Sequence, residues 1–246
     1  VEARPGLGQD GLVSTARSPR AEIREGVAAS LAAGLGLFPL GLALGLLVIQ
    51  HGLPWWLAPA LSIFVYAGSI ELLLVGMIAT ATPLLTVALA TLLVNFRHVF
   101  YAFSFPLKVV RNPVARFYSL YALTDETYAV TSARPTGWTS WRLVALQASL
   151  QSYWVAGGLV GVLLGSLLPA PIQGIGFALT ALFITLALDA CRSVAQLPVA
   201  VLGAVCYVVA AVVIPQAALF VGLLLLLGGL VGRFAVASAR EVRANA

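Results

Sequence analysis

Long apolar stretches separated by short polar turns dominate the chain. Three of them, residues 26–70, 143–188 and 193–232, contain no Asp, Glu, Lys or Arg. A helix needs about 20 apolar residues to cross a bilayer, so each stretch is long enough for about two crossings. The pattern therefore predicts an all-α protein, a polytopic transmembrane helical bundle.

Proline, glycine, tryptophan and charged positions divide these stretches into segments. We expect spans at residues 27–49, 57–79, 83–105, 143–168, 175–190, 197–214 and 217–234, and an ambiguous segment at 117–132. That segment is short and carries two acids, so it is either an eighth span or a re-entrant segment. The prediction is a bundle of seven or eight spans with a broken or re-entrant helix.

The two ends of the chain are more polar than its middle. We expect a cytoplasmic N-terminal tail at residues 1–25, a transmembrane domain at 26–234 and a cytoplasmic C-terminal tail at 235–246. Lys and Arg accumulate on the cytosolic side of membrane proteins. With both termini inside, most arginines meet this rule, and Lys108, Arg111 and Arg116 are the exceptions.

A weak internal similarity links residues 41–47, Gly-Leu-Ala-Leu-Gly-Leu-Leu, to residues 158–164, Gly-Leu-Val-Gly-Val-Leu-Leu. Apolar helices resemble one another by chance, so coincidence and a true repeat both remain open. A true repeat is inverted if an odd number of crossings separates the two starts, and parallel otherwise. The small-xxx-small spacings Gly41/Gly45, Gly157/Gly161/Gly165 and Gly228/Gly232 predict close helix packing.

Composition narrows the class of protein. Of the 246 residues, 61% are hydrophobic and 9% are charged, whereas a soluble domain averages about 25% charged, so a soluble globular domain is excluded. The net charge of +5 comes from basic residues at segment ends, so we expect no nucleic-acid partner. Cys191 and Cys206 lie in apolar surroundings and are expected to be packing residues.

Motifs for enzymatic chemistry are missing from the sequence. We find no Walker loop, no nucleophile elbow and no Cys/His metal cluster. The chain is therefore not expected to be an enzyme, to drive transport with ATP, or to hold a metal or cofactor.

Several charged residues lie in or beside apolar segments, where a charge at mid-bilayer costs about 2.5 to 3.5 kcal/mol. They are Glu71, Arg97, His98, Asp125, Glu126, Asp189 and Arg192. The four acids alone would cost about 10 kcal/mol, comparable with the net stability of a domain. They must be paired, hydrated, or both.

The sequence Tyr-Ala-Gly-Ser-Ile-Glu, residues 66–71, lies in the middle of a predicted span. In a regular helix Glu71 lies about 200° around the axis from Ser69, away from the polar face. Gly68 offers a place to break the helix and expose backbone groups to a ligand. The alternative is a packing glycine and a Glu71 that pairs with Arg97.

Two further segments carry polar stripes. Arg97, Tyr101 and Ser104 follow i, i+4, i+7 spacing with His98 beside them, and Arg97 is suited to be the counter-ion of an intramembrane acid. His98 is either a proton relay or a structural histidine.

In segment 117–132, one helical face would carry Tyr118, Tyr121, Asp125, Tyr128 and Ser132. Such a face suits the wall of an aqueous cavity or a helix lying in the membrane interface.

Asp189 and Arg192 follow i, i+3 spacing, which also allows a purely structural ion pair.

Three motifs in this order and separation resemble the AzlC family of branched-chain amino acid exporters. They are residues 66–71, residues 95–101 (Asn-Phe-Arg-His-Val-Phe-Tyr) and residues 123–129 (Leu-Thr-Asp-Glu-Thr-Tyr-Ala), and the resemblance covers residues 26–234. Family members commonly have Gln where this chain has Glu71, which puts substrate range and coupling in question.

The resemblance implies the large subunit of a two-component exporter of leucine, isoleucine and valine. It implies secondary transport driven by an ion gradient, a small hydrophobic AzlD-type membrane subunit as partner, and a multi-pass location in the bacterial cytoplasmic (inner) membrane.

A zwitterion with an aliphatic side chain needs a group for each charge and an apolar pocket. We therefore expect a central cavity where Gly68, Ser69 and Glu71 meet Arg97, Tyr101 and Asp125 to bind the substrate. His98, Asp125 or Glu126 is expected to exchange the coupling proton. The competing functions are a non-transporting membrane scaffold or assembly subunit, and a channel for small solutes.

Overall fold

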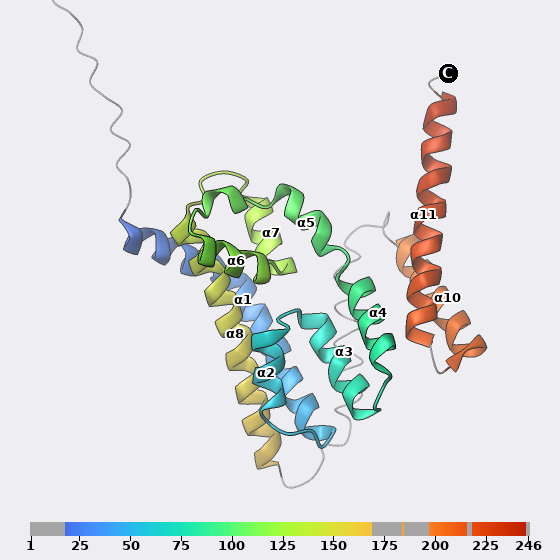
Figure 1. The fold of residues 1–246 in the computed structure, drawn as a ribbon, viewed down its shortest axis with the longest axis horizontal. Coiled ribbons are helices and arrows are strands. Elements are labelled where there is room, and N and C mark those ends of the chain that lie inside the picture. Colours follow the sequence, from blue (N-terminus) through green and yellow to red (C-terminus); the bar gives the residue numbers. More distant parts are fainter. Residues whose placement is uncertain (1–17, 169–183, 185–196, 216–217, 245–246) are drawn as a thin grey trace, which may run out of the picture.

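The computed structural model describes residues 18–168, 184, 197–215 and 218–244, and the elements in this part are all helices (Figure 1). In chain order they are α1 (Pro19–Gln50), α2 (Leu57–Phe64), α3 (Gly68–Ala79), α4 (Leu84–Asn95), α5 (His98–Ser104), a 3₁₀ turn (Leu107–Val109), α6 (Pro113–Tyr121), α7 (Asp125–Ala133), α8 (Ser140–Leu167), α10 (Leu197–Val213) and α11 (Ala218–Ala244). The all-α prediction is confirmed.

Membrane-length helices are present in the described part. Pro19–Gln50, Leu84–Ser104 and Ser140–Leu167 are long and apolar enough to cross a bilayer, judged by length and composition. Shorter apolar helices accompany them at Gly68–Ala79, Leu197–Val213 and Val221–Phe234. The total of seven or eight spans stays a prediction, and the expected span at residues 175–190 lies outside the described residues.

Helices α1 and α8 pack against each other along most of their length. Gly41 and Gly45 of α1 face Gly157 and Gly161 of α8 so closely that a Cβ at any of the four would collide with backbone atoms of the facing helix. The glycine spacings therefore do what small-xxx-small spacing predicts: they bring two backbones together.

The two helices run in the same direction. Near their first turns Gly26 lies against Ala145, and near their last turns Ile49 lies against Gly165. The similar segments 41–47 and 158–164 are thus parallel and adjacent, whereas inversion would make them antiparallel. If these segments do begin two repeats, the repeats are parallel.

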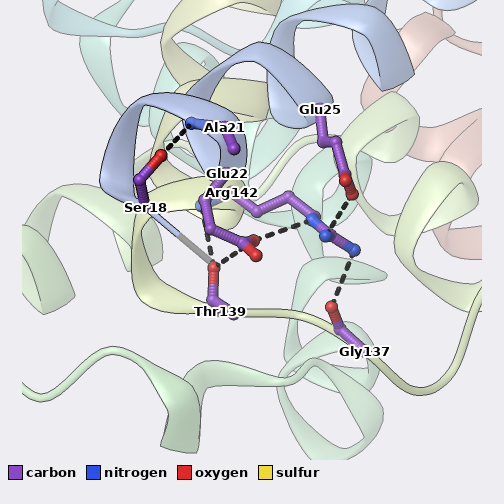
Figure 2. Close-up of polar contacts among 7 residues, drawn as sticks. All are labelled: Ser18, Ala21, Glu22, Glu25, Gly137, Thr139 and Arg142. Carbon is purple, nitrogen blue, oxygen red and sulfur yellow. Dashed lines mark hydrogen bonds and ion pairs between the residues drawn. The ribbon is translucent and has the colours of Figure 1, made fainter. Parts of the chain in front are cut away.

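Helix α1 begins before the predicted span, within the polar N-terminal stretch. Ser18 caps it by accepting the Ala21 backbone N–H at 3.4 Å, and Pro19 occupies the first turn, where its missing N–H is not needed (Figure 2). Thr139 caps α8 in the same way, by accepting the Arg142 N–H at 3.3 Å. Residues 19–25, assigned to the tail from the sequence, are therefore helical.

A cluster of charges joins the N-terminal ends of α1 and α8 (Figure 2). Arg142 pairs with Glu22 at 3.1 Å and with Glu25, and it donates to Gly137 O at 2.8 Å. Thr139 donates to the same Glu22 carboxylate at 2.8 Å. The cluster fixes the two helices to each other at the end where the glycine contacts begin.

Three predicted segments are interrupted. The expected break near Gly68 is present: residues 65–67 separate α2 from α3, and Gly68 starts α3. Between α4 and α5 the α-helical hydrogen-bond pattern is interrupted at residues 96–97, although both residues keep helical backbone angles. The segment 117–132 is broken at residues 122–124 between α6 and α7. The prediction of a single polar face along 117–132 was therefore wrong, because Thr124 caps a new helix, α7, in the middle of that segment.

Helices α10 and α11 pack together as a pair, and α11 also contacts α4 (Figure 1). They correspond to the predicted spans 197–214 and 217–234. Cys206 of α10 is buried with a free thiol, as expected for a packing residue. Cys191 lies outside the described residues.

Candidate functional site

The three helix interruptions meet at one cavity of about 370 Å³. Its wall combines apolar side chains from α1, α3 and α8 with polar groups from the three breaks. The lining residues are Leu37, Leu40, Tyr66, Ala67, Gly68, Ser69, Leu72, Arg97, His98, Thr124, Asp125, Glu126 and Trp154. Its volume lies in the range of small-molecule sites, about 300 to 1,000 Å³.

Arg97 and Asp125 form an ion pair at the polar side of this cavity. Arg97 Nη2 lies 2.6 Å from Asp125 Oδ2, and the two side chains are 44% and 41% exposed. Tyr101 donates to Asp125 Oδ1 at 2.8 Å, and Arg97 donates to Ser69 Oγ at 3.3 Å. Ser69, Arg97 and Asp125 belong to the three interrupted segments, so these contacts link all three, and Arg97 is the counter-ion of Asp125.

His98 and Glu126 line the cavity beside this pair. His98 Nδ1 lies 3.0 Å from Asn95 O, and its ring meets Tyr101 edge to face with centroids 5.3 Å apart. Among the described residues no Lys, Arg or His forms an ion pair with Glu126.

Glu71 lies behind the cavity wall rather than on it. Its side chain is fully buried, its Oε1 accepts the Ala67 N–H at 2.9 Å, and its Oε2 accepts from Trp154 Nε1 at 3.0 Å and from Ser62 Oγ at 3.2 Å. The alternative pairing of Glu71 with Arg97 is wrong, because Arg97 bonds Asp125 instead. Glu71 satisfies the Ala67 backbone N–H at the end of the α2–α3 break and ties the break to α8 through Trp154.

Polar side chains of α8 support the broken helices, and the sequence analysis missed them. Gln147, Gln151 and Trp154 follow i, i+4, i+7 spacing, so they share one face of α8. Gln147 is fully buried, donates to Ser119 O at 2.8 Å and to Ala122 O at 3.1 Å, and thereby satisfies the C-terminal carbonyls of α6.

Gln151 does the same for α2, though at longer distance. Its Nε2 reaches Ser62 O at 3.4 Å and the Tyr121 hydroxyl at 3.0 Å, and Tyr121 in turn donates to Ile63 O. Backbone groups freed within a bilayer must find protein partners. Two glutamines four residues apart in an apolar helix were the available signal for this support.

Tyr66 is the most unusual residue of the cavity wall. Its φ of 43° is in the left-handed region, which non-glycine residues seldom adopt and which costs about 1 to 3 kcal/mol. Its side chain is 5% exposed, and its hydroxyl has no hydrogen-bond partner among the described residues. A buried unpaired hydroxyl costs about a further 1 to 3 kcal/mol. Two unfavourable features at one residue, on the wall of a cavity, point to a functional constraint.

Other sequence-predicted residues have separate outcomes. The cavity is lined by Gly68, Ser69, Arg97, His98, Asp125 and Glu126. Tyr101 does not line it but donates to Asp125, which does. The predicted pair of Asp189 and Arg192 lies outside the described residues. Within the described part no group of three or more His, Cys, Asp or Glu is arranged to hold a metal ion.

Comparison with known proteins shows that the part of the chain forming this cavity matches a known family. A sequence model of the family described as AzlC protein matches residues 32–168, a range that contains every residue lining the cavity. An uncharacterized membrane protein of Helicobacter pylori is 35% identical over 159 residues, which cover 63% of this chain and 69% of the relative.

Two named relatives are more distant. The branched-chain amino acid transport protein AzlC of Bacillus subtilis is 28% identical over 160 residues, covering 63% of this chain and 62% of that protein. The inner membrane protein YgaZ of Escherichia coli is 29% identical over 175 residues, covering 67% and 71%. No solved structure matches the chain. The family match spans more than half of the sequence, and the chain belongs to the AzlC family of membrane proteins.

Proposed function

We propose that the chain is a secondary transporter that exports branched-chain amino acids, with the cavity as its substrate site. The observation that carries this proposal is the juxtaposition of an ion pair and apolar side chains around one substrate-sized cavity. The name of the Bacillus subtilis relative supports the substrate class. Nothing in this mechanism requires enzymatic chemistry.

The cavity chemistry suits an aliphatic zwitterion. Leu37, Leu40, Leu72 and Trp154 form an apolar wall that can receive a branched side chain. Arg97 and Asp125 offer opposite charges that match the carboxylate and ammonium of an amino acid. The exchange of one ion pair for two substrate contacts leaves the total charge of the site unchanged, which lowers the electrostatic cost of binding in a low-dielectric setting.

The roles we propose follow from the positions of the residues. Gly68, Ser69, Arg97 and Asp125 bind substrate directly, and Tyr101 holds the Asp125 carboxylate. Glu71 supports the binding residues from behind the wall by fixing the break that carries Gly68 and Ser69.

Of the three candidates for the coupling proton, Glu126 is the best placed. Asp125 is already matched by Arg97, whereas Glu126 lines the cavity without an ion-pair partner in the described part of the chain. With both carboxylates ionised the cavity carries one more negative than positive charge. A proton taken up by Glu126 removes that excess, and His98, which lines the same cavity, is the proposed relay.

A small AzlD-type membrane subunit is the partner we propose, in the bacterial inner membrane. The stretch Leu84–Ser104 is long enough to span the bilayer, yet only 6% of its apolar window is covered by the rest of the described chain. Large side chains such as Leu84, at 85% exposed, and Phe103, at 84%, therefore face lipid or another subunit.

Counterflow of labelled leucine in proteoliposomes, with and without the small subunit, tests the proposal. A carrier takes up label when unlabelled leucine is inside, a scaffold does not, and a channel dissipates the gradient. Arg97→Gln should abolish counterflow because the substrate carboxylate loses its counter-ion. Arg116→Gln, at an exposed position of α6, is the matched control and should leave it unchanged. Wild-type protein without leucine counterflow in either preparation would contradict the proposal.

A further inference from the structure

Helix α5 borders the cavity but contains no buried residue. Arg97 and His98, at its start, line the cavity. Val99 and Phe103 lie on the side of the helix opposite Arg97 and are 52% and 84% exposed. Within the described part of the chain, burial of this outer face therefore does not hold α5 in place.

A polar face joins α5 to α7 instead. Arg97 pairs with Asp125 at 2.6 Å, and Tyr101 donates to the same carboxylate at 2.8 Å. The hydroxyls of Ser104 and Tyr128 hydrogen-bond at 3.0 Å, and the rings of Tyr101 and Tyr128 stack with centroids 4.2 Å apart. We call these five residues the latch, because their contacts connect the segment of α5 to α7.

The chain on both sides of α5 can act as a hinge. Before it, the α-helical hydrogen-bond pattern is interrupted at residues 96–97. After it, Phe105 is buried and extended, with φ −69° and ψ 135°, and Pro106 has no backbone N–H with which to continue the helix. Hinges are positions at the ends of elements that absorb changes in φ and ψ. Helix α5 can therefore turn between these two points once the latch opens.

We propose that α5 is a gate of the cavity, and that the transported amino acid opens it by displacing the Arg97–Asp125 ion pair. This inference rests on the proposed function and deepens it by linking substrate binding to movement. The substrate carboxylate takes Arg97, and the substrate ammonium takes Asp125. Each side chain keeps a partner of opposite charge while α5 and α7 separate, so the gate opens without leaving an unpaired charge in the cavity.

Opening requires both charges of the substrate. A carboxylate alone would occupy Arg97 but would leave Asp125 bonded to Tyr101, so the latch would stay closed. An ammonium alone would occupy Asp125 but would leave the Arg97 guanidinium without its counter-ion. The latch therefore lets the chain distinguish an amino acid from an aliphatic acid or amine of similar size.

Distances between spin labels report on the gate in proteoliposomes. With Cys191→Ser and Cys206→Ala as background, labels at Phe103→Cys on α5 and Leu167→Cys on α8 lie at exposed positions outside the latch. Leucine should shift the distance distribution of this pair. Labels at Leu31→Cys on α1 and Leu167→Cys form the matched control. Their distribution should be the same with and without leucine, because glycine contacts hold α1 and α8 together.

Two analogues of leucine test the need for both charges. 4-Methylpentanoate lacks the ammonium group, and 3-methylbutylamine lacks the carboxylate. Neither should shift the distribution of the α5–α8 label pair, even in large excess over the leucine concentration that shifts it. A shift with either analogue alone would overturn the displacement mechanism.

Tyr128→Leu weakens the latch without labels and without changing a residue that lines the cavity. Because the closed latch competes with substrate, a weaker latch raises the fraction of protein ready to bind, and the Kd for labelled leucine should fall. Loss of one stacked aromatic pair predicts a fall of about two- to tenfold. Tyr207→Leu, at an exposed position of α10, is the control and should leave the Kd unchanged.

The outcomes separate this inference from the proposed function. Labelled protein that transports leucine with an unchanged α5–α8 distribution refutes the gate alone, and so does an unchanged or raised Kd in folded Tyr128→Leu. If Tyr128→Leu does not fold, the label distances decide. Wild-type protein without leucine counterflow refutes the proposed function and, with it, this inference.

Discussion

The α1–α8 pair and the three interrupted segments satisfy their backbone hydrogen-bonding groups in opposite ways. In α1 and α8 the backbone is continuous, and glycines bring the two helices into direct contact along their length. In the segments from α2 to α7 the regular helix is interrupted three times, and backbone groups at these interruptions need hydrogen-bond partners from elsewhere. One region is a rigid frame, and the other exposes polar groups to a cavity.

The breaks depend on the frame. The supporting face of α8, defined by Gln147, Gln151 and Trp154, bonds groups at both the α2–α3 and the α6–α7 interruptions. Leu37 and Leu40 of α1 supply part of the apolar cavity wall. Damage to the frame should therefore reduce stability and transport together, whereas damage at the cavity should reduce transport alone.

The largest effect should come from separating the two frame helices. Gly161→Leu would place a side chain where Leu42 backbone atoms of α1 already lie, and overpacking of this kind costs about 1 to 3 kcal/mol or more. We expect little folded protein by size-exclusion chromatography in detergent. Gly36→Leu is the control, because no atom lies within 4 Å of a Cβ there. Equal yields of the two variants would contradict the glycine contact.

Removal of the charge that joins the ends of the frame should have the next largest effect. Arg142→Met leaves the Glu22 carboxylate, 8% exposed, without its cation, and loss of a partner from a buried pair costs about 3 to 5 kcal/mol. Because Arg142 is 18% exposed and lies at the helix end, we expect about 2 to 3 kcal/mol, seen as a lower melting temperature. Arg111→Met, at an exposed position, should not change it.

The support that α8 gives to the breaks should be measurable next. Gln147→Leu removes the partner of the Ser119 carbonyl and of the Ser119 hydroxyl, and each unpaired buried group costs about 1 to 3 kcal/mol. We expect faster hydrogen exchange in α6 and α7 together with a lower melting temperature. Ser152→Ala, which removes an exposed hydroxyl from the same helix, should behave as wild type. Exchange confined to α8 would show that Gln147 does not hold the break.

Sequence reasoning predicted parts of this arrangement because they are local. Gly68 marked the break, and helix periodicity placed Glu71 about 200° from Ser69. The structure agrees within α3, where Ser69 lines the cavity and Glu71 does not. The wrong prediction for 117–132 came from extending the same periodicity across a break, because Thr124 as a helix cap was not recognised.

The partners of Glu71 could not be predicted because they are not local. Trp154 lies 83 residues from Glu71 along the chain, and Gln147 lies 28 residues from Ser119. The α1–α8 contact decides which helix packs beside a broken segment. A single sequence shows the glycine spacing that favours such a contact, but not which two helices make it. The choice of Asp125 rather than Glu71 as the Arg97 partner has the same origin.

The smallest effect on stability should come from loss of the cavity ion pair. Here the cavity region differs most from the α1–α8 frame, because the expected loss is in transport and not in stability. Asp125 and Arg97 are each more than 40% exposed, and exposed pairs contribute about 0 to 1 kcal/mol. Asp125→Asn should therefore leave the melting temperature within about 2 to 4 °C of wild type. Leucine counterflow should nevertheless fall sharply, because the variant lacks the carboxylate that receives the substrate ammonium. Glu25→Gln, which removes a carboxylate from the frame instead, should retain counterflow. A variant of Asp125 that transports at the wild-type rate would mean that the ion pair only holds the broken segments together, and the cavity would then have to bind its substrate without it.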